Sequence, residues 1–215
     1  MAVTFGSCLA EQAQAQAGEI AIEDGAGAVT FAALEEGVSQ LATRLAALDL
    51  GASPRIVLIA ENSVVHLTTA FAIWQAGATL VTVYPSSTAD ELEYALTHSR
   101  PALVIAGASV LPTVGPVAQR LGLRLLTLPP SGAIDGLPDA PAATPVIDPE
   151  GLALICYTSG STARPKAVMH RHAGLLGAAA AYARVWHLGP DDATLVCLPM
   201  AWAFGLVTTS MAALL

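Results

Sequence analysis

Charged residues are scarce in this sequence: they make up 12% of its 215 residues, whereas hydrophobic residues make up 54%. With so little charge to cover a surface, most of the chain is expected to face a core. Positively charged residues are fewer than negatively charged ones, with 9 Lys and Arg against 17 Asp and Glu, and the formal net charge is −8. Because a nucleic-acid-binding protein needs a basic surface to meet phosphates, this balance argues against a nucleic-acid partner.

Cysteine is also scarce, since the chain has only Cys8, Cys156 and Cys197, odd in number and far apart. This pattern argues against a disulfide framework and indicates a reducing compartment, so we expect a cytoplasmic protein. The N-terminus lacks a basic stretch followed by an apolar run, and no signal peptide is expected. His170 and His172 lie near Cys156 in the sequence without the spacing of metal ligands, so we expect no metal site built from protein side chains.

Two long stretches carry almost no charge, residues 62–89 and residues 195–215. Their length is that of a membrane-spanning helix. The first is interrupted by Gly77, after which a β-branched run favours a turn and a buried strand, and the second is interrupted by Pro199 and Gly205. We therefore expect no membrane span.

Apolar runs and helix-like periods alternate over the first 128 residues. Residues 19–30 predict a small hairpin, and residues 34–48 have the four-and-three spacing of an amphipathic helix. Buried strands are then predicted at 55–60, 79–83, 102–106 and 124–128, with helices at 63–76, 88–98 and 110–121 between them. Strands that alternate with helices predict an α/β fold with mainly parallel sheets and helices packed on both faces.

Residues 129–149 break this alternation, because prolines recur there with small residues between them. Such a segment predicts a surface linker. We therefore expect a first α/β subdomain at 1–128, a Pro-rich linker at 129–149 and the start of a second α/β subdomain at 150–215. In this last part a strand at 152–157, a helix at 172–187 and a strand at 194–198 are predicted.

A run rich in hydroxyls and glycine follows the predicted strand at 152–157. It reads Thr-Ser-Gly-Ser-Thr-Ala and ends at Arg164, Pro165 and Lys166. Hydroxyls, backbone amides and cations in this pattern wrap an anion, and phosphate is the anion that we expect. A Walker-type loop is disfavoured, because Pro165 stands where that motif has a glycine and no hydroxyl follows Lys166 to hold magnesium.

The segment YTSGSTARPKAV resembles the signature Y-T-S-G-S/T-T-G-x-P-K-G-V of the adenylate-forming enzymes, which include the acyl-CoA synthetases. Ala163 and Ala167 depart from this signature, which has glycine at both positions. Further segments resemble the family's T-Y/F-x-E-L, K-A-G-A, N-P…T-x-x-E-L and L-P-x-F-H-x-x-G patterns, at residues 30–34, 74–78, 84–92 and 198–205. The chain is therefore similar to the N-terminal portion of this superfamily, nearest its acyl-CoA synthetase branch.

The resemblance implies an AMP-forming acid–thiol ligase. Such an enzyme uses ATP and Mg²⁺ to convert a small-molecule carboxylic acid into an acyl-adenylate and then into a thioester, with coenzyme A as the expected acceptor. The resemblance assigns the β- and γ-phosphates of ATP to Thr158, Ser159, Gly160, Ser161, Thr162 and Lys166. It assigns Trp202 and Gly205 to the acyl-substrate pocket, with Trp202 at a position that is usually histidine in the family.

The nature of Trp202 narrows the expected acid. Tryptophan has one N–H donor and otherwise presents a flat apolar wall. Residues 201–203 also contain no acidic group to pair with the α-ammonium of an amino acid. We therefore expect a fatty or aryl acid as the substrate.

The family's later segments, which bind adenine, ribose and magnesium and carry a catalytic lysine, are not found in these 215 residues. The main catalytic residues are accordingly unknown, and the resemblance implies that they lie beyond Leu215. We expect an N-terminal part that is inactive alone and that works with the C-terminal portion of the same enzyme or with a second copy of the chain. The alternative is a non-catalytic relative that acts as a binding or dimerising module.

Overall fold

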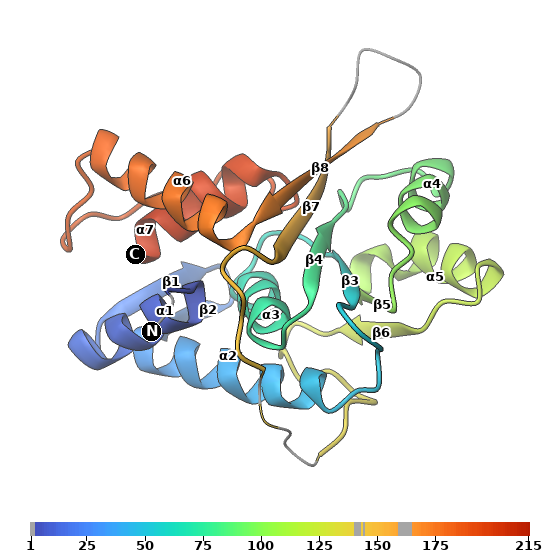
Figure 1. The fold of residues 1–215 in the computed structure, drawn as a ribbon, viewed down its shortest axis with the longest axis horizontal. Coiled ribbons are helices and arrows are strands. Elements are labelled where there is room, and N and C mark those ends of the chain that lie inside the picture. The colour runs from blue at the N-terminus through green and yellow to red at the C-terminus, as the bar shows by residue number, and fades with distance from the viewer. Residues whose placement is uncertain (1–2, 140–142, 144, 159–164) are drawn as a thin grey trace.

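A six-stranded sheet with the strand order β6-β5-β3-β4-β7-β8 organises the computed structural model (Figure 1). The structure describes residues 3–139, 143, 145–158 and 165–215. β7 is parallel to β4, whereas β8 is antiparallel to β7. The strands are β3 (Arg55–Ile59), β4 (Thr79–Thr82), β5 (Leu103–Gly107), β6 (Leu125–Leu128), β7 (Leu152–Thr158) and β8 (Lys166–Arg171). The predicted α/β class with a mainly parallel sheet is confirmed.

Helices cover both faces of this sheet. One face packs against α1 (Phe5–Ala15), α2 (Phe31–Ala46), α3 (Val64–Gln75), α6 (His172–Val185), the π-helix η2 (Phe204–Met211) and α7 (Ala212–Leu214). The other face packs against α4 (Ala89–Ser99), the short η1 (Ala108–Val110) and α5 (Leu111–Arg120). A two-stranded antiparallel hairpin, β1 (Ile20–Asp24) and β2 (Gly27–Thr30), lies outside the main sheet.

The apolar runs of the central strands follow from burial on both faces. In β3, Ile56 and Leu58 belong to the core under α2 and α3, whereas Val57 and Ile59 belong to the core under α4 and α5. Successive side chains of a strand point to opposite faces, so a strand covered on both sides needs apolar residues at every position. This is why these strands lack the alternating pattern of a half-exposed sheet.

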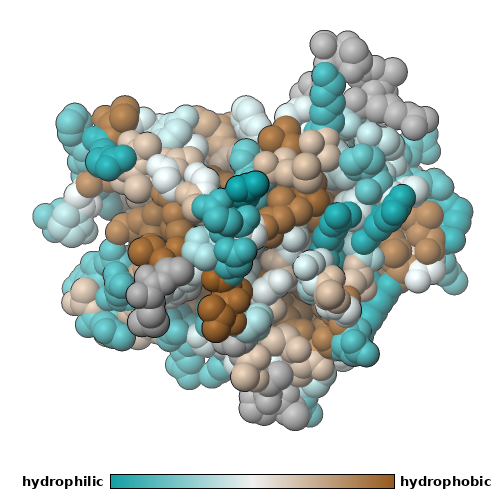
Figure 2. Space-filling model, in the orientation of Figure 1, coloured by the Kyte–Doolittle hydropathy of each residue, from teal (hydrophilic) through white to brown (hydrophobic). Residues whose placement is uncertain are grey.

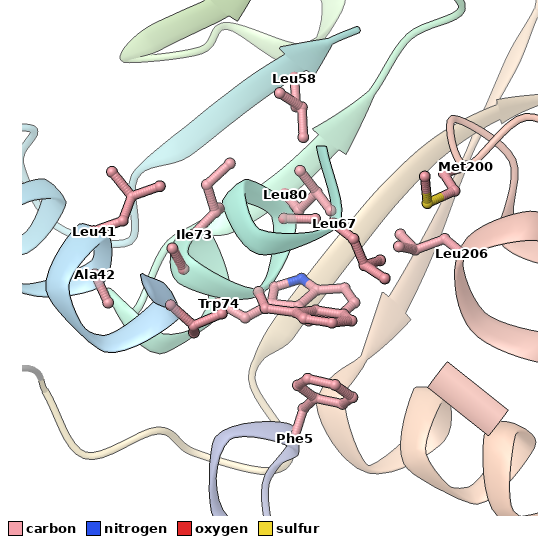
Figure 3. Packing of buried hydrophobic residues seen from close by; sticks show 14 of the residues in the cluster. Phe5, Leu41, Ala42, Leu58, Leu67, Ile73, Trp74, Leu80, Met200 and Leu206 are labelled. Carbon is pink, nitrogen blue, oxygen red and sulfur yellow. The ribbon is translucent and has the colours of Figure 1, made fainter. Parts of the chain in front are cut away.

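Trp74 of α3 links the two halves of the chain inside the larger core (Figure 3). Its ring lies 6.0 Å from that of Phe5 and 5.7 Å from that of Phe71, measured between ring centroids. Its indole N–H donates a hydrogen bond of 2.8 Å to the backbone carbonyl of Ala153 in β7. Because both partners are buried, this bond fixes α3 on the strand that precedes the hydroxyl-rich segment.

Local signals in the sequence account for several helix ends. The hydroxyl of Ser63 accepts the amide of His66 at the start of α3. Thr88 and Glu91 form a capping box at the start of α4. Gly77 follows α3 with a φ of 77°, a left-handed conformation that glycine adopts without a Cβ clash.

Low charge content has a visible consequence at the surface. Figure 2 shows hydrophobic residues reaching the surface in several patches between hydrophilic ones. The larger exposed side chains include Met169, Val185, Leu195 and Trp202. Across the described part of the chain, no helix is long and apolar enough to cross a membrane.

The predicted strand at residues 194–198 is wrong, because the chain there forms neither helix nor strand. Leu195 is 85% exposed, so the apolar run does not mark burial. Helix α1 and strand β8 were not predicted from the sequence. The division into subdomains at 1–128 and 150–215 stays a prediction, and β7 pairs with β4 in one sheet.

Candidate functional site

The β7–β8 hairpin holds the two ends of the hydroxyl-rich segment. Thr158 ends β7 and Lys166 begins β8, and the two residues are partners in the strand register. The hydroxyl of Thr158 donates to the backbone carbonyl of Lys166 over 3.5 Å. Of the six residues assigned to phosphate binding, the structure therefore brings Thr158 and Lys166 together. The other four, Ser159, Gly160, Ser161 and Thr162, lie outside the described residues.

The position of this hairpin follows from the sheet. β7 runs parallel to β4, so Thr158 lies at the carboxyl edge of the parallel strands. This edge is where open α/β sheets bind their ligands. Lys166 is exposed there, and it brings a positive charge to the strand position opposite Thr158. The arrangement suits an anionic ligand with several oxygen acceptors, such as a phosphate chain.

Helix α4 contacts this hairpin next to the hydroxyl-rich segment. The hydroxyl of Tyr94 donates to the carbonyl of Pro165 over 3.1 Å, and the Tyr94 ring stacks on His98 at 5.6 Å. Tyr157 of β7 donates its own hydroxyl to the carbonyl of Ala95 at 3.1 Å. Burial raises the pKa of Tyr157, so this phenol keeps its proton and remains a donor. Tyr94 was not predicted as a site residue from the sequence, because its partner is 71 residues away.

Cys156 and His170 lie side by side on β7 and β8, with 3.7 Å between Sγ and Nε2. Burial raises the pKa of the Cys156 thiol, which argues against a reactive thiolate. In the described ranges there is no group of three or more His, Cys, Asp or Glu side chains that would hold a metal ion. We therefore interpret this pair as part of the packing between the two strands.

The residues assigned to the acyl pocket lie in the segment before and within η2. Trp202 is 44% exposed, and its ring lies 6.2 Å from that of Phe204. The Phe204 ring in turn lies 6.2 Å from that of Tyr182 in α6 and 6.3 Å from that of Trp186, the residue that follows α6. We call these four residues the aromatic cluster. It forms an apolar wall, and the hydrogen bonds and ring contacts described for it do not join it directly to the Thr158–Lys166 pair.

Gly205 is required by close backbone packing. A Cβ at this position would lie 2.5 Å from the carbonyl oxygen of Pro199 and 2.8 Å from that of Leu198. The absence of a side chain therefore lets the start of η2 press against the turn before Trp202. Gly205, which the resemblance assigns to the acyl pocket, has a packing role near Trp202 in the structure, and its place in the pocket stays a prediction.

Leu215, beyond which the main catalytic residues are expected, packs against the larger core next to α7. Its backbone carbonyl accepts a hydrogen bond of 2.7 Å from Nε2 of Gln12 in α1. The last residue of the chain is thus held against the first helix by a specific contact. The assignment of the main catalytic residues to positions beyond Leu215 stays a prediction.

The fold is of the α/β class, and the Thr158 hydroxyl and Lys166 stand at the carboxyl edge of its mainly parallel sheet, an arrangement typical of sites that bind phosphate-bearing ligands. A family model described as AMP-binding enzyme matches residues 9–215. The chain belongs to this family of AMP-binding enzymes, as the signature at residues 157–168 predicts.

Two of the curated relatives that this chain resembles form CoA thioesters by name. The mitochondrial malonate–CoA ligase ACSF3 of Bos taurus is 33% identical over 156 residues, which are 71% of this chain and 26% of that protein. Feruloyl-CoA synthase of an Amycolatopsis species is 32% identical over 205 residues, which are 94% of this chain and 41% of that protein. The chain thus spans less than half the length of these relatives.

Solved structures of CoA ligases and related enzymes share the fold of this chain. ATP-bound MatB from Rhodopseudomonas palustris superposes with a TM-score of 0.86 and 28% identity, over 100% of this chain and 44% of that chain. A benzoate CoA ligase from Burkholderia xenovorans LB400 superposes with a TM-score of 0.85 and 26% identity, over 99% and 44% of the two chains. The predicted likeness to the acyl-CoA synthetases is confirmed.

Proposed function

We propose that this chain supplies the ATP-phosphate-binding part of an acid–thiol ligase that forms an acyl-adenylate and then a thioester. The pairing of Thr158 with Lys166, at the ends of β7 and β8 next to the hydroxyl-rich segment, carries the proposal. The β- and γ-phosphates of ATP are assigned to Thr158, Ser159, Gly160, Ser161, Thr162 and Lys166. The ATP-bound state of the related MatB structure supports the use of ATP.

The proposed chemistry needs positioning and charge neutralisation. A carboxylate attacks the α-phosphate of ATP, forming an acyl–phosphate bond while the bond to pyrophosphate breaks. Negative charge then collects on the departing phosphates, where the Lys166 ammonium and the hydroxyl donors stabilise it. Mg²⁺ accompanies ATP in this proposal. Because the described residues hold no cluster of three potential metal ligands, we assign none of them to the metal.

The aromatic cluster supports an apolar acid as the substrate. Trp202 and Phe204 offer ring faces, which suit the chain of a fatty acid or the ring of an aryl acid. A dicarboxylate such as malonate needs a second cationic partner, because an unpaired carboxylate on an apolar wall is costly. We therefore favour a fatty or aryl acid, with coenzyme A as the acceptor. The three free cysteines support a cytoplasmic location.

Nucleotide binding is tested first, with the chain as it stands. Lys166 is the only lysine among the 215 residues, so an amine-reactive label reports on it apart from the N-terminus. We expect ATP to protect Lys166 from labelling and adenosine to leave it reactive. Lys166→Ala is expected to weaken ATP binding about 10- to 100-fold in calorimetry, since a charge-assisted contact contributes about 1.5–3 kcal/mol.

Arg120→Ala is the matched control, because Arg120 is an exposed cation at the end of α5 whose described ion pair is with Glu93 of α4. It is expected to bind ATP as the parent does. Equal losses in the two variants, or labelling that ATP leaves unchanged, would contradict the phosphate site.

Turnover is tested by ATP–pyrophosphate exchange with a fatty acid, an aryl acid and malonate. We expect no exchange by the chain alone, and robust exchange would show that this expectation is wrong. A polypeptide carrying the family's later segments is then added. Exchange with the fatty or aryl acid supports the ligase, whereas binding of ATP and acid without exchange favours the alternative, a non-catalytic binding or dimerising module.

A further inference from the structure

Asn62 connects two segments of the chain that lie 136 residues apart. Its Nδ2 donates a hydrogen bond of 2.8 Å to the carbonyl of Leu198, and its Oδ1 accepts one of 2.8 Å from the amide of Met200. Both polar functions of the side-chain amide are used, as the donor and acceptor of a neighbouring strand would be. Asn62 is the only asparagine in the chain.

The loop that carries Asn62 is itself held firmly. It joins β3 to α3, and the next residue, Ser63, caps α3 by accepting the amide of His66 at 3.0 Å. The carboxylate of Asp24 accepts the amide of Val64 at 2.8 Å, which ties the same helix start to the β1–β2 hairpin. Asn62 therefore projects from a rigid corner of the fold.

The partner segment has no sheet or helix to hold it. Residues 193–199 form no regular element, and η2 begins only at Phe204. The amide of Trp202 donates to the carbonyl of Pro199 at 3.0 Å, so the turn held by Asn62 directly carries the tryptophan. Gly205 packs against the carbonyls of the same turn. A shift of this turn consequently moves the apolar wall.

If Asn62 had a purely structural role, its replacement would mainly lower the stability of the fold. The bond from Nδ2 to Leu198 is exposed, and water replaces an exposed hydrogen bond with little loss of stability. Water does not fix the direction of the turn, however, and a small displacement of a substrate-positioning group is costly for binding and reaction. Loss of Asn62 should therefore affect the acid site more than the stability of the fold.

We propose that Asn62 is a positioning residue for the acyl site, because it holds the 198–200 turn and thereby sets where Trp202 stands against an apolar acid. This inference rests on the proposed function. Asn62→Ala removes both hydrogen bonds. Asn62→Asp keeps the acceptor for Met200 but turns a second acceptor toward the Leu198 carbonyl, so it tests the donor separately. Gln40→Ala is the control, since Gln40 is an exposed amide that bonds to Glu36 within α2.

The first readout is hydrogen exchange in the 215-residue chain without ligand. We expect Asn62→Ala to speed amide exchange at least about 10-fold in residues 198–206 and to leave β7 and β8 as in the parent. Unchanged exchange in residues 198–206 would overturn the proposal, and so would a faster exchange spread evenly over the fold.

The second readout is the affinity for an aryl acid and for ATP, measured in parallel. Both Asn62 variants are expected to lose at least about 10-fold in acid affinity and to keep ATP affinity within about 2-fold, whereas Gln40→Ala keeps both. If the parent binds the acid and Asn62→Ala binds it with the same affinity, this inference alone is overturned. A parent that binds ATP but no acid overturns the acid site as well, so the two failures are distinguishable.

Discussion

Acidification is expected to destabilise the fold through His66 in the first turn of α3. Its ring is completely buried, and Nδ1 lies 3.0 Å from the carbonyl of Ala60. A carbonyl only accepts, so Nδ1 carries the proton of the neutral ring. Nε2 is buried without a partner, and a second proton placed there would meet no acceptor. Burial therefore lowers the pKa of His66 to about 4 from 6.5.

The sign and size of the effect follow from this pKa. Below pH 6.5 the unfolded chain takes up a proton on His66 that the folded chain refuses, so stability falls as the pH falls from 6.5 to about 4. Because one pKa unit is worth about 1.4 kcal/mol, the full loss is about 3 kcal/mol. Burial also lowers the pKa of His172, which adds loss in the same direction. The pKa of Asp24 is lowered by the amides of Val64 and Ala26, and its contribution is lost only below pH 3.8.

Urea unfolding at several pH values between 7.5 and 4.5 measures this loss. His66→Asn keeps a donor near the position of Nδ1 but does not titrate, so its stability should depend less steeply on pH, from a lower starting value at pH 7.5. His187→Asn is the control, because His187 is exposed and asparagine tolerates its φ of 56°. The reasoning is refuted if the parent keeps its stability down to pH 4.5, or if His66→Asn keeps the parent's slope.

Two further predictions concern close packing and a buried hydrogen bond. Gly205→Ala should lower the free energy of unfolding by about 1–3 kcal/mol in urea titrations, because its Cβ meets the Pro199 carbonyl at 2.5 Å. Gly177→Ala is the control on the exposed face of α6, where a Cβ has nothing within 4 Å, and it should raise the free energy of unfolding by about 0.5–1 kcal/mol. Equal effects of the two substitutions would contradict the packing argument. Trp74→Phe should cost about 2–3 kcal/mol in calorimetric or urea unfolding, because it removes the buried hydrogen bond to the carbonyl of Ala153 and part of a packed ring. A cost below about 0.5 kcal/mol would show that this bond does not hold α3 on β7.

Part of the candidate site was accessible from the sequence alone. The order of hydroxyls, glycine and lysine identified Thr158 and Lys166 through the resemblance, and the structure pairs them across the hairpin. Asn62 and Tyr94 were missed. Each bonds to a backbone carbonyl more than 70 residues away, and no spacing in the sequence reports such a contact.

Local order was determined by the sequence itself, because caps, turns and apolar periods act over three or four residues. The capping box of Thr88 and Glu91 and the left-handed Gly77 are examples, and the apolar runs of the parallel strands needed only their own composition. The tertiary structure decided which edges were paired: β8 joined β7 at the edge, while residues 194–198 remained without a strand partner. An apolar run becomes a strand only where another strand's amides and carbonyls are free to meet its own, and that depends on the whole fold.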